Sequence, residues 1–332
     1  MTISLGSVPA RSNDVGAAIR ERIETLSQEM ASGQVADRGR AVRSDFSELS
    51  RLRHDLGTSL ARHTSLARAE RWSDGLLSAL AANAGDQAVL IEQLAVLSGE
   101  DSGAGTTAIA LAAEDTLAAM MARLGGTQDG RALFANGDAG GSVLPSPDAL
   151  LADLRALAAA ETDPDILLQT FDDYFAPGGT FETSVMRDFA TANVRFPTGQ
   201  GQSVAIPVDL DDPAIRATLR DTAILAILPA SPASTDPGDR ADLHAELLER
   251  LVHNSGAVVA TQGRIGTVAN GLSDGVARVS AEMLSIEASI AEIVGSDPYE
   301  TASRLQEQIS RLESHYAVTA RLSRLSLTDY LR

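Results

Sequence analysis

The stretch "RLQEQISRLESHYAVTARLSRLSLTDYL", residues 304–331, decides the fold class because its apolar residues recur at helical spacing. Leu305, Ile309, Leu312 and Tyr316 follow one another at intervals of 4, 3 and 4 residues, the heptad-like seam of a helix packed on another helix. Four leucines continue the apolar pattern: Leu322, Leu325, Leu327 and Leu331. A lone helix with so narrow an apolar face is marginal in water, so we expect a second helix to cover it.

A matching seam lies near the other end of the sequence. Ile19, Ile23, Leu26 and Met30 also step by 4, 3 and 4 residues. The two seams predict a parallel or antiparallel helix pair, but pairing within one chain would cover only one face of each helix. We therefore predict contacts between copies through an assembly interface formed by Ile19, Ile23, Leu26, Met30, Leu305, Ile309, Leu312, Tyr316, Leu322, Leu325, Leu327 and Leu331.

The composition indicates a helical protein without a nucleic-acid or membrane partner. The 332 residues are 44% hydrophobic but only 4% aromatic, which favours helices packed through small side chains. The net charge of −18 argues against binding to nucleic acid or to an anionic membrane, because both attract basic surfaces. No apolar stretch approaches the roughly 20 residues that span a bilayer. The first residues also lack the apolar run of a cleavable signal peptide.

Two missing residue types exclude whole classes of chemistry. The sequence has no cysteine, which excludes disulfides, thiolate nucleophiles and cysteine metal sites. It also has no lysine, since all 27 basic residues are arginine, and this excludes Schiff-base chemistry and a P-loop lysine.

Charge, proline and aromatic residues all mark a distinct middle segment. Residues 73–250 hold 9 Arg and 27 Asp or Glu, a net charge of −18, whereas residues 1–72 (11 − 9 = +2) and 251–332 (7 − 9 = −2) cancel each other. Ten of the 12 prolines lie between Pro145 and Pro237. We therefore predict a terminal coiled-coil domain (1–40 and 296–332), a helical bundle domain (41–137 and 239–295) and an inserted acidic outer domain (138–238).

The predicted fold is mainly α, with long terminal helices pairing as a coiled coil or helical bundle around an inserted mixed α+β domain. Helical periodicity predicts long helices over 42–97, 106–124 and 241–294. Within the insert, helices are expected over 146–160, 164–175 and 211–228, and a hairpin over 192–208. The Pro- and Ser-rich stretch 229–239 is expected to be a linker.

Candidate catalytic and metal-binding motifs are weak. "SGAGTTAIA" (102–110) matches a nucleotide-loop spacing but follows the end of a helix instead of a strand. Asp209, Asp211 and Asp212 lack the rest of a calcium loop, and a helix N-terminal cap explains them better. Asp172 and Asp173 are adjacent and make a poor acid–base pair. We predict no enzyme activity and no catalytic, cofactor or metal residues.

Three stretches resemble the bacterial flagellin family. "ETLSQEMASGQ" (24–34) is similar to its N-terminal helix, and 302–331 resembles the C-terminal helix, with its leucine–serine–leucine and tyrosine–leucine ending. "GRALFANGD" (130–138) resembles the family's stretch before the variable outer domain. The sequence departs from the family at "VADRGRAVRSDFSEL" (35–49), where an Asn- and Asp-rich segment is usual.

The resemblance implies a structural axial protein of the flagellum. Such a protein would leave the cell unfolded through the flagellar type III export apparatus, with an export chaperone and without a cleaved signal. It would form a ring of copies at the hook–filament junction, between hook-associated protein 1 and flagellin. Its arms are expected to be disordered before assembly. A filament subunit, a needle-tip or translocator-like protein of another secretion system, and a protein with a binding site in the acidic insert remain alternatives.

Overall fold

The computed structural model describes residues 8–42, 45–97, 103–134, 144–185, 195–199, 201–206 and 210–330. For residues 8–13, 40, 184–185, 199 and 322–330 it describes the backbone only. The chain forms two compact units, the first made of residues 1–61 with 279–332 and the second of residues 62–278. Most of the described residues are helical, and the few strands are short, so the predicted mainly α fold is confirmed.

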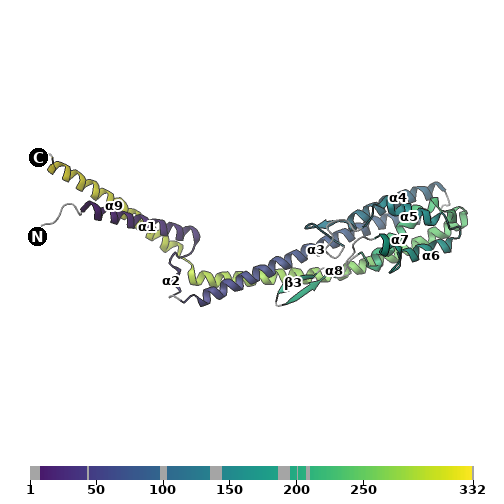
Figure 1. The fold of residues 1–332 in the computed structure, drawn as a ribbon, viewed down its shortest axis with the longest axis horizontal. Helices are drawn as coiled ribbons and strands as arrows, with labels where there is room; N and C mark the ends of the chain where they lie inside the picture. Colours follow the sequence, from purple (N-terminus) through teal and green to yellow (C-terminus); the bar gives the residue numbers. More distant parts are fainter. Residues whose placement is uncertain are drawn as a thin grey trace. The chain divides into compact units, whose positions relative to one another are not determined.

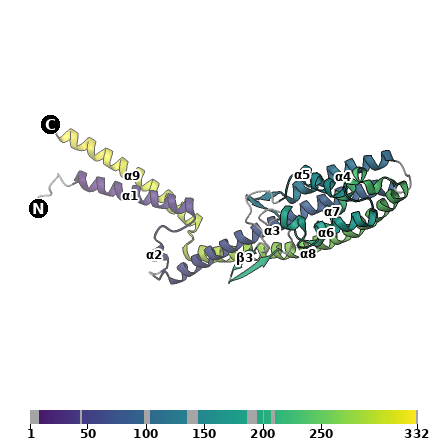
Figure 2. The same ribbon diagram turned by 45° about the vertical axis from the view of Figure 1, so that its right-hand side comes forward.

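The first unit is built around two antiparallel terminal helices, α1 (Val8–Ser32) and α9 (Pro298–Tyr330), which lie side by side in Figures 1 and 2. The C-terminal end of α1 meets the N-terminal end of α9. There Gln34 forms a β-bridge with Gly295, Val35 N donates to Val294 O at 2.9 Å, and Ser296 N donates to Gly33 O at 3.0 Å. Gly33, which ends α1, has a φ of 67° that favours glycine.

The rest of the first unit consists of the short helix α2 (Arg38–Ala41) and the neighbouring ends of two long helices. These are α3 (Ser47–Leu97) and α8 (Pro237–Val294). Leu49 and Leu52 of α3 are buried in this unit, as is Val294 at the end of α8. The Ser59 hydroxyl on α3 donates to Glu282 Oε1 on α8 at 3.1 Å, so the two helix ends lie in contact.

In the second unit, α3 and α8 form a long antiparallel pair with heptad burial. Positions at alternating intervals of 3 and 4 residues are buried on α3 (Leu66, Ala69, Ser73, Leu76, Leu80, Asn83, Gln87, Leu90, Leu94) and on α8 (Leu247, Leu251, Asn254, Val258, Thr261, Ile265). Gln87 Nε2 donates to Leu251 O at 3.4 Å across this pair. Polar side chains therefore occupy several core positions of an otherwise leucine-rich seam.

Four shorter helices and two hairpins complete the second unit. The helices are α4 (Gly103–Leu124), α5 (Pro147–Ala158), α6 (Pro164–Phe175) and α7 (Pro213–Ile227), and nearly every residue of α7 is buried. β1 (Thr127–Gln128) pairs with β2 (Arg131–Ala132), and β3 (Arg195–Gly199) pairs with β4 (Gln202–Ala205), both antiparallel. A π-helical turn (Phe181–Val185) follows α6.

A capping residue followed by proline sets the start of three short helices, α5, α6 and α7. Ser146, Asp163 and Asp212 each accept a backbone N–H from the first turn of the helix that follows, and proline occupies the first helical position each time. A side-chain acceptor satisfies a free N–H of the first turn, and the fixed φ of proline suits the helix start. These signals are local, which is why the sequence placed α5, α6 and α7 within two residues.

Most predicted elements are confirmed, with one correction. The hairpin expected over 192–208 is β3–β4, and the long helices differ from the expected bounds only at their first residues. The predicted linker at 229–239 is wrong. Two 3-10 turns (Leu228–Ala230 and Pro232–Ser234) fill it, then α8 begins at Pro237, and Ala233 and Ser234 are buried. The Ser234 hydroxyl donates to Leu228 O, which tightens this turn against the core.

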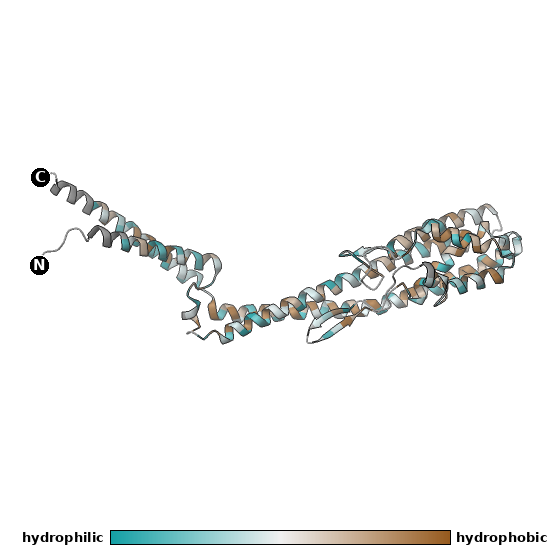
Figure 3. Ribbon diagram, in the orientation of Figure 1, coloured by the Kyte–Doolittle hydropathy of each residue, from teal (hydrophilic) through white to brown (hydrophobic). Residues whose placement is uncertain are grey.

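Hydropathy varies from helix to helix. Figure 3 shows teal, hydrophilic turns along α1 and α9, and pale to brown turns along α4. The core of α4 explains the difference, because Ile109, Ala113, Leu117 and Met120 are all buried. Within the described ranges, no helix combines the length and apolarity that a membrane span requires.

Candidate assembly surface

The terminal helix pair is the first candidate site. On α1, the least exposed positions include Gly16, Ile19, Ile23 and Leu26, which follow the predicted heptad spacing. Leu26 is 1% exposed and is the best-buried side chain of α1 among those described. Met30, the last residue of the predicted seam, is 52% exposed. The seam of α1 therefore packs inward at its middle and opens at its C-terminal end.

The seam of α9 has a different register from the predicted one after Leu312. The least exposed positions are Thr301, Ala302, Leu305, Gln308, Ile309, Leu312, His315 and Thr319. His315 faces α1, since a Cβ placed on Gly16 would lie 3.4 Å from His315 Cε1. Tyr316, which the apolar spacing favoured, is 51% exposed. The inward positions are thus partly polar, and an apolar pattern alone could not find Gln308, His315 and Thr319.

The predicted interface residues divide by exposure. Leu26 is buried within the pair, while Ile19, Ile23, Leu305, Ile309 and Leu312 are partly buried, and Met30 and Tyr316 are half exposed. Leu322, Leu325 and Leu327 have only their backbone described, and Leu331 lies outside the described residues. The structure contains one chain, so the contact between copies stays a prediction.

Exposed apolar side chains occur on more than one side of the terminal pair. Tyr316 is 51% exposed and Val318 is 55% exposed, and Val15 on α1 is 50% exposed. Residues two apart on an α-helix point about 200° apart, so Tyr316 and Val318 face opposite ways. The pair therefore offers apolar contacts to partners on two sides.

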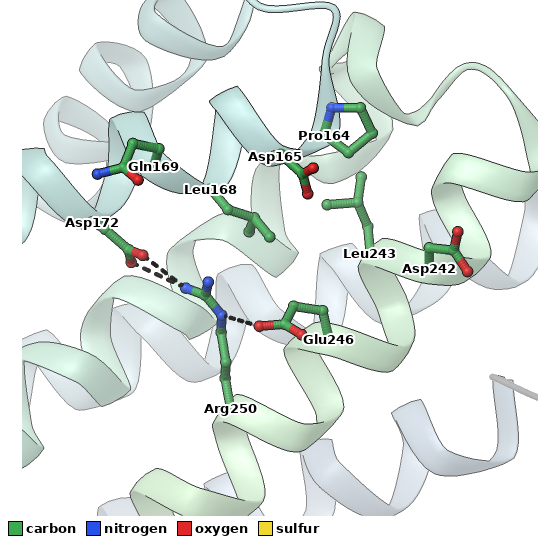
Figure 4. A pocket seen from close by; sticks show the side chains of 9 residues that line it. All are labelled: Pro164, Asp165, Leu168, Gln169, Asp172, Asp242, Leu243, Glu246 and Arg250. Atoms are coloured by element: carbon green, nitrogen blue, oxygen red, sulfur yellow. Dashed lines mark hydrogen bonds and ion pairs between the residues drawn. The ribbon is translucent and has the colours of Figure 1, made fainter.

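The second candidate is a polar groove of about 360 Å³ between α6 and the start of α8 (Figure 4). Two of its carboxylates bind Arg250 of α8. Arg250 Nη1 donates to both oxygens of Asp172 on α6 at 3.0 and 3.2 Å, and Arg250 Nε donates to Glu246 at 2.8 Å. Asp165 and Asp242 also line the groove.

The ion network continues from this groove into the core. Arg220 of α7 contacts Asp172 at 2.9 Å and donates through Nε to Asp221 at 2.7 Å, and Asn254 Nδ2 donates to the other Asp221 oxygen. Burial raises the pKa of the Asp221 carboxyl, and Arg220 and Arg250 oppose this rise. The network joins α6, α7 and α8, so its charges are occupied in holding three helices together. Structural ion-pair networks of this kind also shift the pKa values of their members.

The remaining weak motifs have structural roles. Asp212 accepts from Ala214 N at 3.0 Å, as the predicted helix cap, and also pairs with Arg264 at 2.8 Å. Asp173 accepts from Gln169, while Asp172 points to α8, so the two adjacent carboxylates do not face each other. Gly103 begins α4, and the helix before it, α3, ends at Leu97. Asp209 lies outside the described residues. Among the residues described, no three histidines or carboxylates gather as a metal site.

Residues 254–331, which include the last 41 residues of α8 and all of α9, match the family model of the bacterial flagellin C-terminal helical region. Particular structures have the same fold. FlgL of Bacillus cereus matches with a TM-score of 0.52 at 10% identity, over 73% of this chain and 100% of that one. A flagellar hook-associated protein from Vibrio parahaemolyticus matches with a TM-score of 0.52 at 8% identity, over 76% and 99%. A search of curated proteins finds no match.

Proposed function

We propose that the chain is a structural axial protein of the bacterial flagellum and forms the junction layer between hook and filament, the role of hook-associated protein 3. The main support is that α9, which lies within the region that matches the flagellin family model, pairs antiparallel with the N-terminal helix α1. The pair has apolar side chains on opposite sides, where neighbouring subunits could cover them.

Assembly into a ring would explain why apolar side chains are exposed on two sides of the terminal pair. Each copy in a ring meets two neighbours through different surfaces, and such head-to-tail contacts close into a ring when the rotation allows. In this proposal the predicted interface residues other than Leu26, which is buried within the pair, face copies of the same chain. The layer touches hook-associated protein 1 on one side and flagellin on the other. The protein would be extracellular, after export by the flagellar type III apparatus with its chaperone.

The proposed domain roles follow the charge map. The terminal segments 1–40 and 296–332 would line the tube, 41–137 and 239–295 would form the bundle around them, and the acidic segment 138–238 would face the solvent. The two structural units divide the chain at other positions, after residues 61 and 278, and α7 packs within the core of the second unit. The three-part division therefore stays a prediction about the assembled state.

Growth of the purified protein tests the junction role against its nearest alternative, a filament flagellin. A junction protein meets unlike partners at its two axial ends, whereas a flagellin meets itself. We expect that concentrated full-length protein forms no long filaments, even with filament seeds. Long filaments grown from this protein alone would identify a filament subunit. The proposal includes no enzyme activity, since the paired carboxylates of the polar groove already hold α6, α7 and α8 together.

A further inference from the structure

Helix α8 carries four glycines close together in the middle of its length. Gly256, Gly263, Gly266 and Gly271 fall within 16 residues, whereas α3 has three glycines over its 51 residues. We call residues 256–271 the glycine segment. Glycine loses more backbone entropy than alanine when it joins a helix, so a helix opens about fivefold more readily at each such position. The glycine segment is therefore a stretch of weak helix preference inside a long helix.

Packing among the described residues does not require these glycines. Three of the four are exposed and Gly266 is partly exposed, and no described atom lies within 4 Å of a Cβ placed on any of them. Gly275, just after the segment, is different because a Cβ there would lie 3.5 Å from Leu66 Cδ1. Alanine would fit at all four positions of the segment and would favour the helix.

The inward face of α8 also becomes less apolar along the glycine segment. The buried positions before it are all leucine (Leu243, Leu247, Leu251), whereas polar or small side chains alternate with aliphatic ones from there on (Asn254, Val258, Thr261, Ile265, Ala269). The free energy of burial is roughly proportional to the apolar area removed from water. Opening the glycine segment therefore exposes less apolar side chain of α8 than opening the leucine-rich part does.

Polar contacts tie the glycine segment to the start of α7. Arg264 Nη2 donates to Asp212 Oδ2 at 2.8 Å, and the Thr261 hydroxyl lies 3.4 Å from both oxygens of the same carboxylate. The Arg264 side chain is 56% exposed, so water screens this ion pair. Near Gly271, a groove of about 390 Å³ lies between α8 and hairpin β3–β4. These contacts outside the α3–α8 seam hold the segment weakly.

We propose that α8 opens locally over the glycine segment before the leucine-rich part of the α3–α8 pair separates. Its role rests on the proposed function, in which the chain is exported unfolded and must first lose its helix pairs. The glycine segment gives that unfolding a starting point within the second unit. Helices stay paired elsewhere until the opening spreads.

Hydrogen–deuterium exchange of the purified full-length chain, read by mass spectrometry, tests the opening without any flagellum. After correction for intrinsic exchange rates, we expect peptides within 256–271 to exchange about tenfold or more faster than peptides within 243–253. Replacing all four glycines with alanine should slow exchange in the segment by about fivefold for each glycine that the opening includes.

Gly57→Ala is the matched control, because it makes the same change at an open position of α3 in the first unit. It should leave exchange within the glycine segment unchanged. Equal exchange of 256–271 and 243–253 in the parent chain would overturn the inference. Equal slowing by Gly57→Ala would overturn it too, because the segment would then open only with the whole chain.

Export measures the role of the opening. We expect the variant with four alanines to appear outside the cell more slowly than the parent chain, relative to the total made. Equal export of the two chains would refute this role and leave the proposed function in place. Export of neither chain would contradict the proposed function, while the exchange measurement would still decide the opening. Slow exchange in the parent segment, with loss of assembly in the alanine variant, would make the glycines a contact between copies and overturn the inference.

Discussion

His315 packs directly over Gly16, where a Cβ on Gly16 would lie 3.4 Å from His315 Cε1. This close approach joins the two ends of the sequence. Gly16→Ala should be tolerated and should raise helix stability by up to about 1 kcal/mol, because alanine favours helices over glycine. Gly16→Leu should displace His315 and loosen the pair. Circular dichroism of the full chain measures the effect.

Gly57 on α3 supplies the matched control, because nothing lies within 4 Å of a Cβ placed there. Gly57→Leu should leave the helical content unchanged or raise it. If Gly16→Leu behaves like Gly57→Leu, then His315 and Gly16 do not meet in solution.

Limited proteolysis should cut the terminal helices first. The described part of α1 buries only Gly16 and Leu26, and α9 buries Thr301, so this pair has little apolar contact to offset its ordering entropy. In dilute monomer we expect trimming of roughly the first 40 and last 35 residues, while the second unit stays intact. Peptide mapping by mass spectrometry identifies the cuts. Resistant termini in a confirmed monomer would show that the pair is stable without neighbours.

Two aspartate substitutions on α1 should separate pairing within a chain from contact between chains. Leu26 is 1% exposed, so Leu26→Asp buries a charge and should open the α1–α9 pair at a cost of several kcal/mol. Met30 is 52% exposed, so Met30→Asp should leave the pair intact yet still reduce incorporation into flagella.

Thermal melting of the second unit should be the same in both variants. Incorporation is measured by detecting the tagged protein in isolated hook–filament complexes. Normal incorporation of Met30→Asp would remove that residue from the interface, and normal incorporation of Leu312→Asp would remove Leu312 in the same way.

Asp221 should make the second unit less stable as the pH rises. Burial raises the pKa of Asp221 in the folded chain, so the folded state holds this proton more tightly than the unfolded state does. The stabilisation from Asp221 is complete below the ordinary pKa of an aspartate and is lost as pH rises through the folded pKa. Asp221→Asn should remove this dependence, by at most about 1.4 kcal/mol per pH unit for one proton.

Urea unfolding at a series of pH values from the ordinary aspartate range upward measures the slope. Asp172, Arg220, Arg250 and Asn254 surround Asp221 and stay unchanged in the variant. Identical slopes for the parent chain and the Asp221→Asn variant would show that Asp221 titrates at the same pH folded and unfolded.

Local signals made most of the helices predictable. The pairs Ser146–Pro147, Asp163–Pro164 and Asp212–Pro213 each combine a cap with a proline, and both act within one turn. The β3–β4 hairpin was equally predictable, because its turn needs a residue with positive φ and the sequence has Gly201 there, with a φ of 75° that glycine adopts freely. The prediction of a linker at 229–239 was wrong because proline and serine are common in exposed linkers and also in buried 3-10 turns.

The site was less predictable because its geometry depends on contacts far apart in sequence. Nothing near His315 indicates that it packs on Gly16, close to the other end of the chain, and its neighbour Tyr316 fits the apolar spacing better. The Asp172–Arg250 pair links α6 to α8 across 78 residues, and any of the other carboxylates was an equal candidate in the sequence. Spacing predicts which face of a helix is apolar, but the partner helix decides which polar residues share that face.

Electron microscopy of a strain that lacks this protein, together with an assay of flagellin in its medium, tests the proposed junction role. A missing junction layer leaves flagellin without an anchor at the hook tip. We expect complete hooks without filaments, loss of motility, and flagellin monomers released into the medium. Hooks that still carry filaments of another subunit would contradict the junction role.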